Sequence, residues 1–437
     1  MQTFLIVTKI LTSIFGFIWN SFMKLINFFI SLYNKHVRKR NDRINRGVTE
    51  LKQSSINDML PADSYIDNTI ISGGNKALRA DWIAQIVTNG YYKSFPVIIL
   101  HEGNEFLHSS LDSKLTSSDI VYVEHHSPSY EPFYNYSSKE ISKFILDSAT
   151  SDYEIKKNAS YYIEGMCDFL KFKNVKPSLN SFYKCPHLQL FDKIDDLMIK
   201  GIISDTQGQA IKSKLMMGQS EQIKLETFIS DLYDQFESIL CRTKTTPNSI
   251  VSALMNNKVL VIDISSNANN LLVNCLINQI KYAITKGQRM LLVTDDLSSS
   301  NNDLLKKLLS EKNDKCKLIA CGDDMFSVCS GDEKVFGTLV GNSENVLILG
   351  HSSGATCTKW AETIGYYNKE EETQSFEKGS MRHSPFTLFP GSNTSTSKSY
   401  SIKREYIVRP ELINRMSSNE FYMYRHSDNK LIHSFLK

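Results

Sequence analysis

Short apolar runs rich in β-branched residues alternate with helical stretches over most of the chain. Between the runs, apolar residues recur every three or four positions, as in an amphipathic helix, at 77–87, 269–286 and 303–311. The runs that predict buried strands are 68–71, 95–101, 120–124, 258–264, 290–294, 316–321 and 345–350, with two short strands near 421–424 and 431–435. Such alternation predicts an α/β fold with a doubly wound, mostly parallel sheet.

Three regions depart from this alternation. Residues 137–243 have helical periodicity throughout, which predicts an all-α subdomain inserted between strands of the sheet. Residues 379–398 are rich in Ser, Thr, Pro and Gly and predict a mobile loop. We therefore divide the chain into a membrane helix (1–36), a basic linker (37–64), the α/β domain in two parts (65–136 and 244–437) and the insert (137–243).

The third region is the amino terminus, where residues 4–33 are dominated by Leu, Ile, Phe and Trp without a Pro. Polar residues recur three or four apart and form one narrow stripe on an otherwise apolar helix. The helix either spans a bilayer or lies in its interface; spanning is favoured, although Lys24 interrupts each window of about 20 apolar residues. Six Lys or Arg follow at 35–46, so the positive-inside rule predicts a cytoplasmic location for everything after residue 35.

Composition narrows the function classes. A chain of 437 residues is too long for one hydrophobic core. The net charge of +3 gives no global basic field for nucleic acid, so any such contact is local. Eight cysteines without a CxxC pair predict buried, reduced thiols in the cytoplasm, and their spacing fits no common zinc site.

Two carboxylates, Asp295 and Asp296, directly follow the run 290–294. In open α/β sheets, ligands bind outside the carboxyl ends of the strands, so this pair lies where a nucleotide's magnesium ion or an activated water is held. That arrangement is a Walker B strand. The alternative is a strand end followed by a turn that the two Asp residues cap.

A glycine turn joins the strand at 68–71 to the helix at 77–87, through Gly73, Gly74, Asn75 and Lys76. Free backbone N–H groups and the helix dipole make such a turn a phosphate-binding candidate. A P-loop requires G-x-x-x-x-G-K-[ST], however, and here Lys76 is followed by neither a hydroxyl nor a second glycine in register. A plain strand-to-helix turn explains these residues equally well.

With these parts in order, the chain resembles the TraG/TraD-like coupling-protein ATPases of conjugation and type IV secretion, within the FtsK/HerA-type P-loop translocases. The resemblance rests on the membrane anchor, glycine turn, helical insert and Walker B-like strand. Three later segments also match, namely 318–323, 335–340 and 358–365, and the carboxyl-terminal run 404–416 with the strands after it is the most specific. The resemblance to this family implies a RecA-like fold and a location in the inner (cytoplasmic) membrane.

The resemblance also implies site residues and cofactors. ATP and Mg²⁺ would be the ligands, with Asp295 holding the metal through water and Asp296 polarising the attacking water. Gly73, Gly74, Asn75 and Lys76 would bind the phosphates. The chain departs from the family by a degenerate Walker A, by Asp-Asp in place of Asp-Glu and by the absence of a sensing Gln. An arginine finger is not identifiable, and Arg79 and Arg289 are the candidates.

Two functions remain open at this point. An active pump would hydrolyse ATP in a homo-oligomer, with a hexameric ring as the candidate form, and drive DNA or a relaxase-like protein toward the secretion channel. A degenerate relative would keep the fold as a structural or adaptor subunit beside an active ATPase. An unrelated membrane-anchored α/β protein is a third candidate. In each case residues 4–33 would contact the membrane.

Overall fold

A ten-stranded sheet forms the centre of the computed structural model, which describes residues 2–60, 66–149, 153–242, 246–265, 270–297, 303–310, 313–380 and 392–437. The strand order is β1-β12-β11-β8-β2-β7-β6-β3-β5-β4, and every pairing is parallel except those of β11. The strands are β1 (Val48–Glu50), β2 (Thr69–Ser72), β3 (Val97–His101), β4 (Ile120–Val123), β5 (Val259–Asp263), β6 (Met290–Asp295), β7 (Cys316–Gly322), β8 (Asn345–Ile348), β11 (Glu420–Arg425) and β12 (Lys430–Phe435). The predicted doubly wound, mostly parallel α/β sheet is confirmed.

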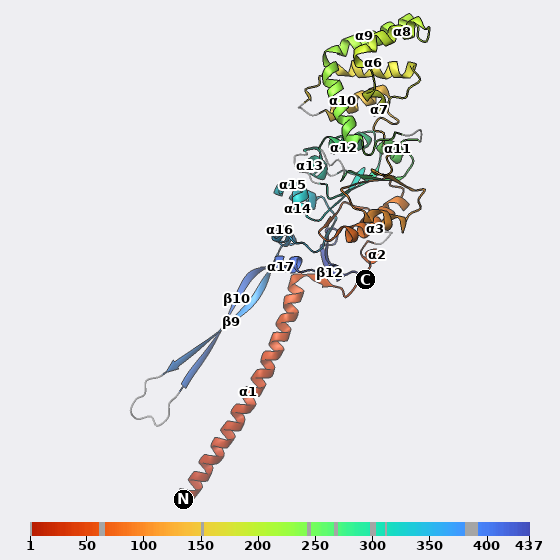
Figure 1. Ribbon diagram of the computed structural model, residues 1–437. Helices are drawn as coiled ribbons and strands as arrows, with labels where there is room; N and C mark the ends of the chain where they lie inside the picture. Colours follow the sequence, from red (N-terminus) through yellow and green to blue (C-terminus); the bar gives the residue numbers. More distant parts are fainter. Residues whose placement is uncertain are drawn as a thin grey trace.

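Helices cover both faces of this sheet (Figure 1). One face packs against α2 (Ile56–Met59), α3 (Lys76–Tyr92) and α4 (Phe106–Asp112). The other face packs against α11 (Ile250–Met255), α12 (Asn270–Thr285), α13 (Asp303–Ser310), α14 (Met325–Val328), α15 (Glu333–Gly341) and α16 (Gly354–Ile364), with α17 (Pro410–Asn414) beside α16. Because both faces are covered, the central strands are apolar along their whole length, which is the pattern that predicted them.

Alternate residues of each strand enter different cores. On β6, Leu291 and Val293 belong to the cluster with α3 and α4, whereas Met290 and Leu292 belong to the cluster on the opposite face. Side chains of a strand point alternately to its two faces, so a strand buried on both sides contributes to two cores at once. All six residues of β6 are buried, including Asp295 at its carboxyl end.

An all-α region caps the end of the molecule opposite α1 (Figure 1). Capping boxes begin α5 at Ser137 and Glu140, and α9 at Ser204 and Gln207. The helices are α5 (Ser138–Ser148), α6 (Ala159–Phe172), α7 (Leu179–Tyr183), α8 (Leu190–Ile199), α9 (Asp205–Gly218) and α10 (Gln222–Phe236), with 3-10 turns η2 (His187–Gln189) and η3 (Gln219–Glu221). Its core is continuous with one core of the sheet, so the domain boundaries at 137 and 243 stay a prediction.

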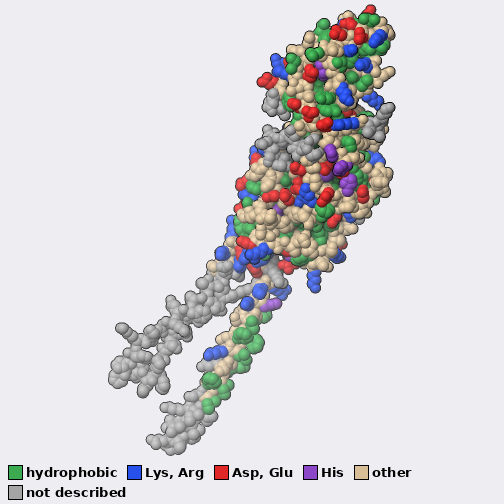
Figure 2. All heavy atoms as spheres, in the orientation of Figure 1, with side chains coloured by type: hydrophobic (Ala, Val, Ile, Leu, Met, Phe, Trp, Pro, Cys, Tyr) green, Lys and Arg blue, Asp and Glu red, His purple; other side chains and the backbone are tan. Residues whose placement is uncertain are grey.

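The amino-terminal helix α1 (Gln2–Arg46) projects from the body (Figures 1 and 2). Large apolar side chains such as Phe15, Phe17 and Trp19 are exposed on it, and by length and composition its Ile14–Arg46 part could cross a membrane. Within the described residues 37–60, the stretch predicted as a linker has regular structure instead: α1 continues through the basic residues, β1 pairs with β12, and α2 follows. Lys and Arg are good helix formers, so a basic composition did not distinguish linker from helix.

A long hairpin includes the described ends of the stretch 379–398, which was expected to be a loop. Strands β9 (Tyr366–Ser380) and β10 (Ser392–Tyr406) pair antiparallel from Tyr366 with Tyr406 to Ser380 with Ser392. The loop prediction is therefore wrong for 379–380 and 392–398, while 381–391 lie outside the described residues. Ser and Gly indicated a turn, but Thr394 and Thr396, which favour a strand, alternate with Ser at the start of β10.

Glu131 joins the all-α region to the sheet. It lies between β4 and α5, is buried, and accepts hydrogen bonds from the backbone N–H groups of Phe133 (3.1 Å) and Leu179 (2.9 Å). Burial raises the pKa of its carboxyl from 4.5 to about 7, and the two hydrogen bonds only partly offset this.

This pKa predicts a pH-dependent stability. Between the ordinary pKa of 4.5 and about 7, the unfolded chain has lost this proton while the folded chain keeps it, so stability falls as pH rises, by roughly 3 kcal/mol in all. Glu131→Gln, which is neutral at every pH, should remove this part of the fall. The thermal midpoint of the detergent-solubilised chain, followed from about pH 5 to about pH 8, measures it. Glu237→Gln, which changes an exposed carboxyl, is the control and should leave the fall of the midpoint with pH as in wild type. An equally steep fall in Glu131→Gln would contradict the buried proton.

Candidate functional site

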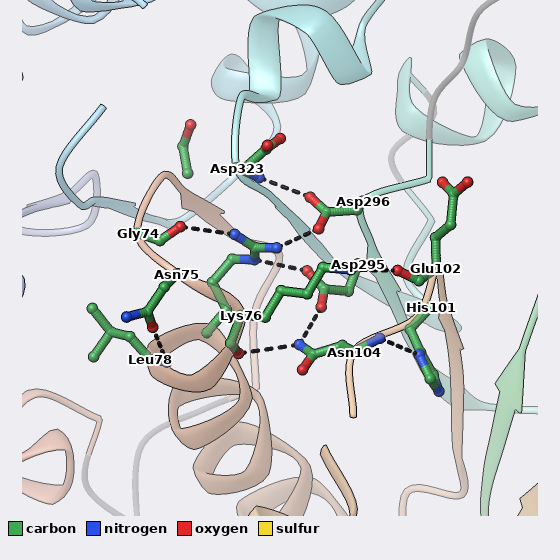
Figure 3. Close-up of polar contacts among 12 residues, drawn as sticks. Gly74, Asn75, Lys76, Leu78, His101, Glu102, Asn104, Asp295, Asp296 and Asp323 are labelled. Atoms are coloured by element: carbon green, nitrogen blue, oxygen red, sulfur yellow. Dashed lines mark hydrogen bonds and ion pairs between the residues drawn. The ribbon is translucent and has the colours of Figure 1, made fainter. Parts of the chain in front are cut away.

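The carboxyl ends of β2 and β6 meet at one edge of the sheet, with β7 between them. The glycine turn follows β2 and leads into α3, whose N-cap Asn75 accepts a hydrogen bond from the N–H of Leu78. Asp295 ends β6 and Asp296 follows it. The predicted juxtaposition of the acidic pair with the glycine turn is confirmed, because one side chain, Arg79, contacts both (Figure 3).

Arg79 lies on the first turns of α3 and is 1 % exposed. Its Nε donates to Asp295 Oδ1 at 2.9 Å, one terminal nitrogen donates to Asp296 Oδ2, and the other donates to the carbonyl of Gly74 at 3.0 Å. A guanidinium has donors in a rigid planar fork, which suits two carboxylates and a carbonyl at the same time. Dashed lines in Figure 3 mark these bonds at the labelled residues Gly74, Asp295 and Asp296.

The remaining carboxylate oxygens are also bonded within the chain. Asp295 Oδ2 accepts from the side-chain amide of Asn104 at 2.6 Å, and that amide also donates to the carbonyl of Lys76 at 3.2 Å. Asp296 Oδ1 accepts from the N–H of Asp323 at 2.8 Å. All four oxygens of the pair therefore have protein donors.

The two neighbouring carboxylates keep the Arg79 guanidinium positively charged. Burial would lower the pKa of the Arg79 guanidinium, but attraction to Asp295 and Asp296 outweighs burial and raises that pKa above its ordinary value. Burial raises the pKa of the Asp296 carboxyl, and Arg79 only partly offsets this shift. The guanidinium is thus a permanent cation between two carboxylates.

The glycine turn is explained by packing. Gly73 and Gly74 have φ of +91° and +70°, where other residues are strained. A Cβ on Gly73 would lie 2.8 Å from the carbonyl oxygen of Gly350, and one on Gly74 would lie 2.7 Å from Leu349 Cδ1. Their N–H groups already donate to the carbonyls of Gly322 (2.9 Å) and Gly350 (3.0 Å). Neither N–H is available to a phosphate.

Lys76 is likewise engaged inside the chain. Its Nζ donates to the carbonyls of Glu102 and Gly103, both at 2.9 Å. These carbonyls belong to the loop after β3. The Lys76 side chain thus connects that loop to the start of α3 by hydrogen bonds, and its role here is structural.

A magnesium nucleotide does not fit these residues. The metal would need carboxylate oxygens that Arg79 and Asn104 occupy, and the phosphates would need N–H groups and an ammonium that carbonyls occupy. Among the described residues, no group of three or more His, Cys, Asp or Glu is placed to hold a metal. A phosphate cradle also needs a wider loop than the three residues between β2 and α3.

A cavity of about 830 Å³ opens on the other side of the glycine turn, toward β8 and α17. Asp323 and Asp324 line it with several Ser side chains, and no Lys or Arg among the described residues lines it. His351, also at its wall, is neutral because burial lowers its pKa to about 4. The cavity therefore has carboxylates and no cation to attract a phosphate.

The sequence prediction identified Asp295, Asp296 and the glycine turn but not the residues that connect them. Arg79 was considered only as a candidate arginine finger, and Asn104 was not singled out. Arg289 lies at the amino end of β6, away from the site, with its guanidinium 5.9 Å from the centre of the Phe95 ring. The only signal for Arg79 was a cation one helical turn after the glycine turn, on a helix that begins at the same edge of the sheet.

Loss of Arg79 should destabilise the fold strongly. Arg79→Met leaves two buried carboxylates without their cation, and breaking a buried ion pair by removing one partner costs about 3–5 kcal/mol. Arg242→Met, which removes an exposed arginine paired with Glu237, should cost less than about 1 kcal/mol. Denaturant unfolding of the solubilised chain compares the two, and equal losses would contradict the structural role of Arg79.

No family model matches the sequence, and no curated protein matches it in sequence. Solved structures of the bacterial conjugative coupling protein TrwB match the fold. The unbound form TrwBdeltaN70 has 14 % identity and a TM-score of 0.52, over 88 % of each chain. The complex with the GTP analogue GDPNP has 14 % identity and a TM-score of 0.53, and the complex with ADP and Mg²⁺ has 13 % identity and a TM-score of 0.50. Each of these two matches covers 88 % of this chain and 89 % of the TrwB chain. The chain therefore has the fold of the conjugative coupling protein TrwB.

Proposed function

We propose that the protein is a membrane-anchored, coupling-protein-like subunit of a conjugative or type IV secretion system that does not turn over ATP. It serves as a structural or adaptor subunit that docks a substrate, DNA or protein, or an active ATPase partner. The observation that carries the proposal is the buried contact of Arg79 with Asp295 and Asp296, since it occupies the groups that would hold magnesium and nucleotide.

The TrwB fold supports the choice of system. TrwB is described as a plasmid coupling protein and is found in complex with ADP and Mg²⁺. This chain has the fold at 13–14 % identity, with a layered sheet and an all-α region whose surfaces are available for binding partners. Binding partners requires those surfaces, whereas hydrolysis requires the metal and phosphate ligands as well.

The helix α1 is the proposed membrane anchor of the protein. Its apolar side chains are exposed along one long helix, and lipid is the solvent that such a surface favours. The basic residues 35–46 after the apolar part favour a cytoplasmic location for the sheet and the all-α region, at the inner membrane.

A nucleotide titration tests the absence of turnover. A ligand at 100 times its dissociation constant stabilises the folded state by about 2.7 kcal/mol. Because Arg79 occupies the groups that would hold magnesium and nucleotide, wild type should bind no Mg-ATP. Millimolar Mg-ATP should then cause no rise in the thermal midpoint and no phosphate release. Saturable binding together with turnover that Asp296→Ala abolishes would instead support an active pump and overturn the proposal.

Thiol labelling tests the orientation. Leu188, 88 % exposed in the all-α region, is a suitable position for an introduced cysteine. With Leu188→Cys, a membrane-impermeant maleimide should label inside-out membrane vesicles and leave intact spheroplasts unlabelled. Labelling of intact spheroplasts would place the all-α region outside the cytoplasm, and a chain found in the soluble fraction would refute the anchor. Wild type, in which seven of the eight cysteines are buried, sets the background.

A further inference from the structure

The β9–β10 hairpin leaves the body at the same end as α1, and both project away from it (Figure 1). Its base is fixed to the cytoplasmic end of that helix. The Tyr367 hydroxyl donates to Asp42 at 3.0 Å and accepts from Arg46 at 3.2 Å, and Glu405 on β10 pairs with Lys369 at 2.9 Å. The hairpin and the anchor are therefore tied together at the base.

The hairpin is longer than the cytoplasmic part of α1. Residues 34–46 of a helix that rises about 1.5 Å per residue extend about 20 Å from the membrane surface to the base. Fifteen residues of strand at about 3.4 Å extend about 50 Å in the same general direction. The hairpin can thus reach past the surface by about the 30 Å thickness of a hydrocarbon core.

Lipid cannot solvate the two paired strands of such a hairpin. In the sequence of its outer part, 370–380 and 392–399, Phe376 is the only large apolar residue among Ser, Thr, Asn, Gln, Glu and Lys. Within the described residues, β9 and β10 form a two-stranded sheet of their own, so each strand keeps one edge without a strand partner. Exposed strand edges do not occur in contact with lipid, and an isolated hairpin is marginally stable even in water.

A second copy of this chain can complete both edges. The sequence of β9 has four Glu and two Lys, a net charge of −2, whereas that of β10 has two Lys, one Arg and one Glu, a net charge of +2. The open edge of the acidic strand β9 in one copy is therefore complementary in charge to the open edge of the basic strand β10 in the next copy. Contacts of this head-to-tail type close into a ring when the rotation between copies allows it.

We propose that β9 of one copy pairs edge to edge with β10 of the next, so that the hairpins of an oligomer close a polar β-ring inside a ring of α1 helices. Closure removes every open edge and keeps the polar hairpins away from lipid. The inference rests on the membrane anchor of the proposed function and is independent of whether ATP is turned over.

Cross-linking between copies tests the pairing. Thr373 and Ser399 are partners within one hairpin, so they lie at the same height, and in a ring each should lie near the other residue of the adjacent copy. Copies with one tag and Thr373→Cys are co-expressed with copies carrying another tag and Ser399→Cys, in a Cys241→Ser background, and treated in membranes with a short bismaleimide. Since each copy has one introduced cysteine, a product with both tags joins two copies.

The expected product carries both tags, and the matched control, Thr373→Cys in both copies, should give severalfold less. Absence of the 373–399 product, or an equal yield from the control, overturns the proposal. Labelling of the Leu188→Cys chain, expressed alone and prepared in the same way, shows separately whether the anchor is in place, so the failure of the hairpin pairing and the failure of anchoring are distinguishable.

Charge reversal tests the complementarity. Glu371→Lys with Glu372→Lys makes β9 basic and should lower the cross-link yield severalfold. Adding Lys398→Glu and Lys403→Glu makes β10 acidic in the same chain and should restore the yield. A yield that does not recover, or one that the first pair of substitutions leaves unchanged, contradicts charge pairing between β9 and β10 of adjacent copies.

Discussion

The contact of one buried guanidinium with two carboxylates organises the edge of the sheet where the site lies. Arg79 joins α3, β6 and the glycine turn through three hydrogen bonds, to Asp295, Asp296 and the carbonyl of Gly74, and its own side chain is almost fully buried. Desolvating three charges is costly, and only their close mutual pairing with further hydrogen bonds offsets that cost. The geometry around Asp295 therefore depends on Arg79 remaining in place.

This contact also determines what the fold can do. A doubly wound sheet gathers its loops at the carboxyl ends of the strands, where such proteins hold ligands. An exchangeable metal and nucleotide at this edge can alternate between bound states and drive motion, whereas a cation that belongs to the chain cannot leave. The same architecture then provides fixed surfaces, an anchor and a hairpin, which suits a subunit that positions other molecules.

Periodicity predicted the strands and helices of the sheet because burial on two faces leaves a clear apolar run, as at 290–294. It also placed Asp295 beside the glycine turn, since parallel strands end at one edge. It did not predict that Arg79 and Asp295, 216 positions apart, are bonded, because sequence spacing carries no record of a contact between a helix and a distant strand. The hairpin was missed for a different reason: alternating Ser and Thr lack the apolar face that marks a strand.

The most direct measurement is an experimental structure of the full chain in detergent or nanodiscs with millimolar Mg-ATP. The account predicts that Arg79 Nε stays about 2.9 Å from Asp295 Oδ1, with no phosphate or metal between the glycine turn and the acidic pair. A bound nucleotide at this edge, with the Arg79 side chain displaced from Asp295 and Asp296, would contradict it.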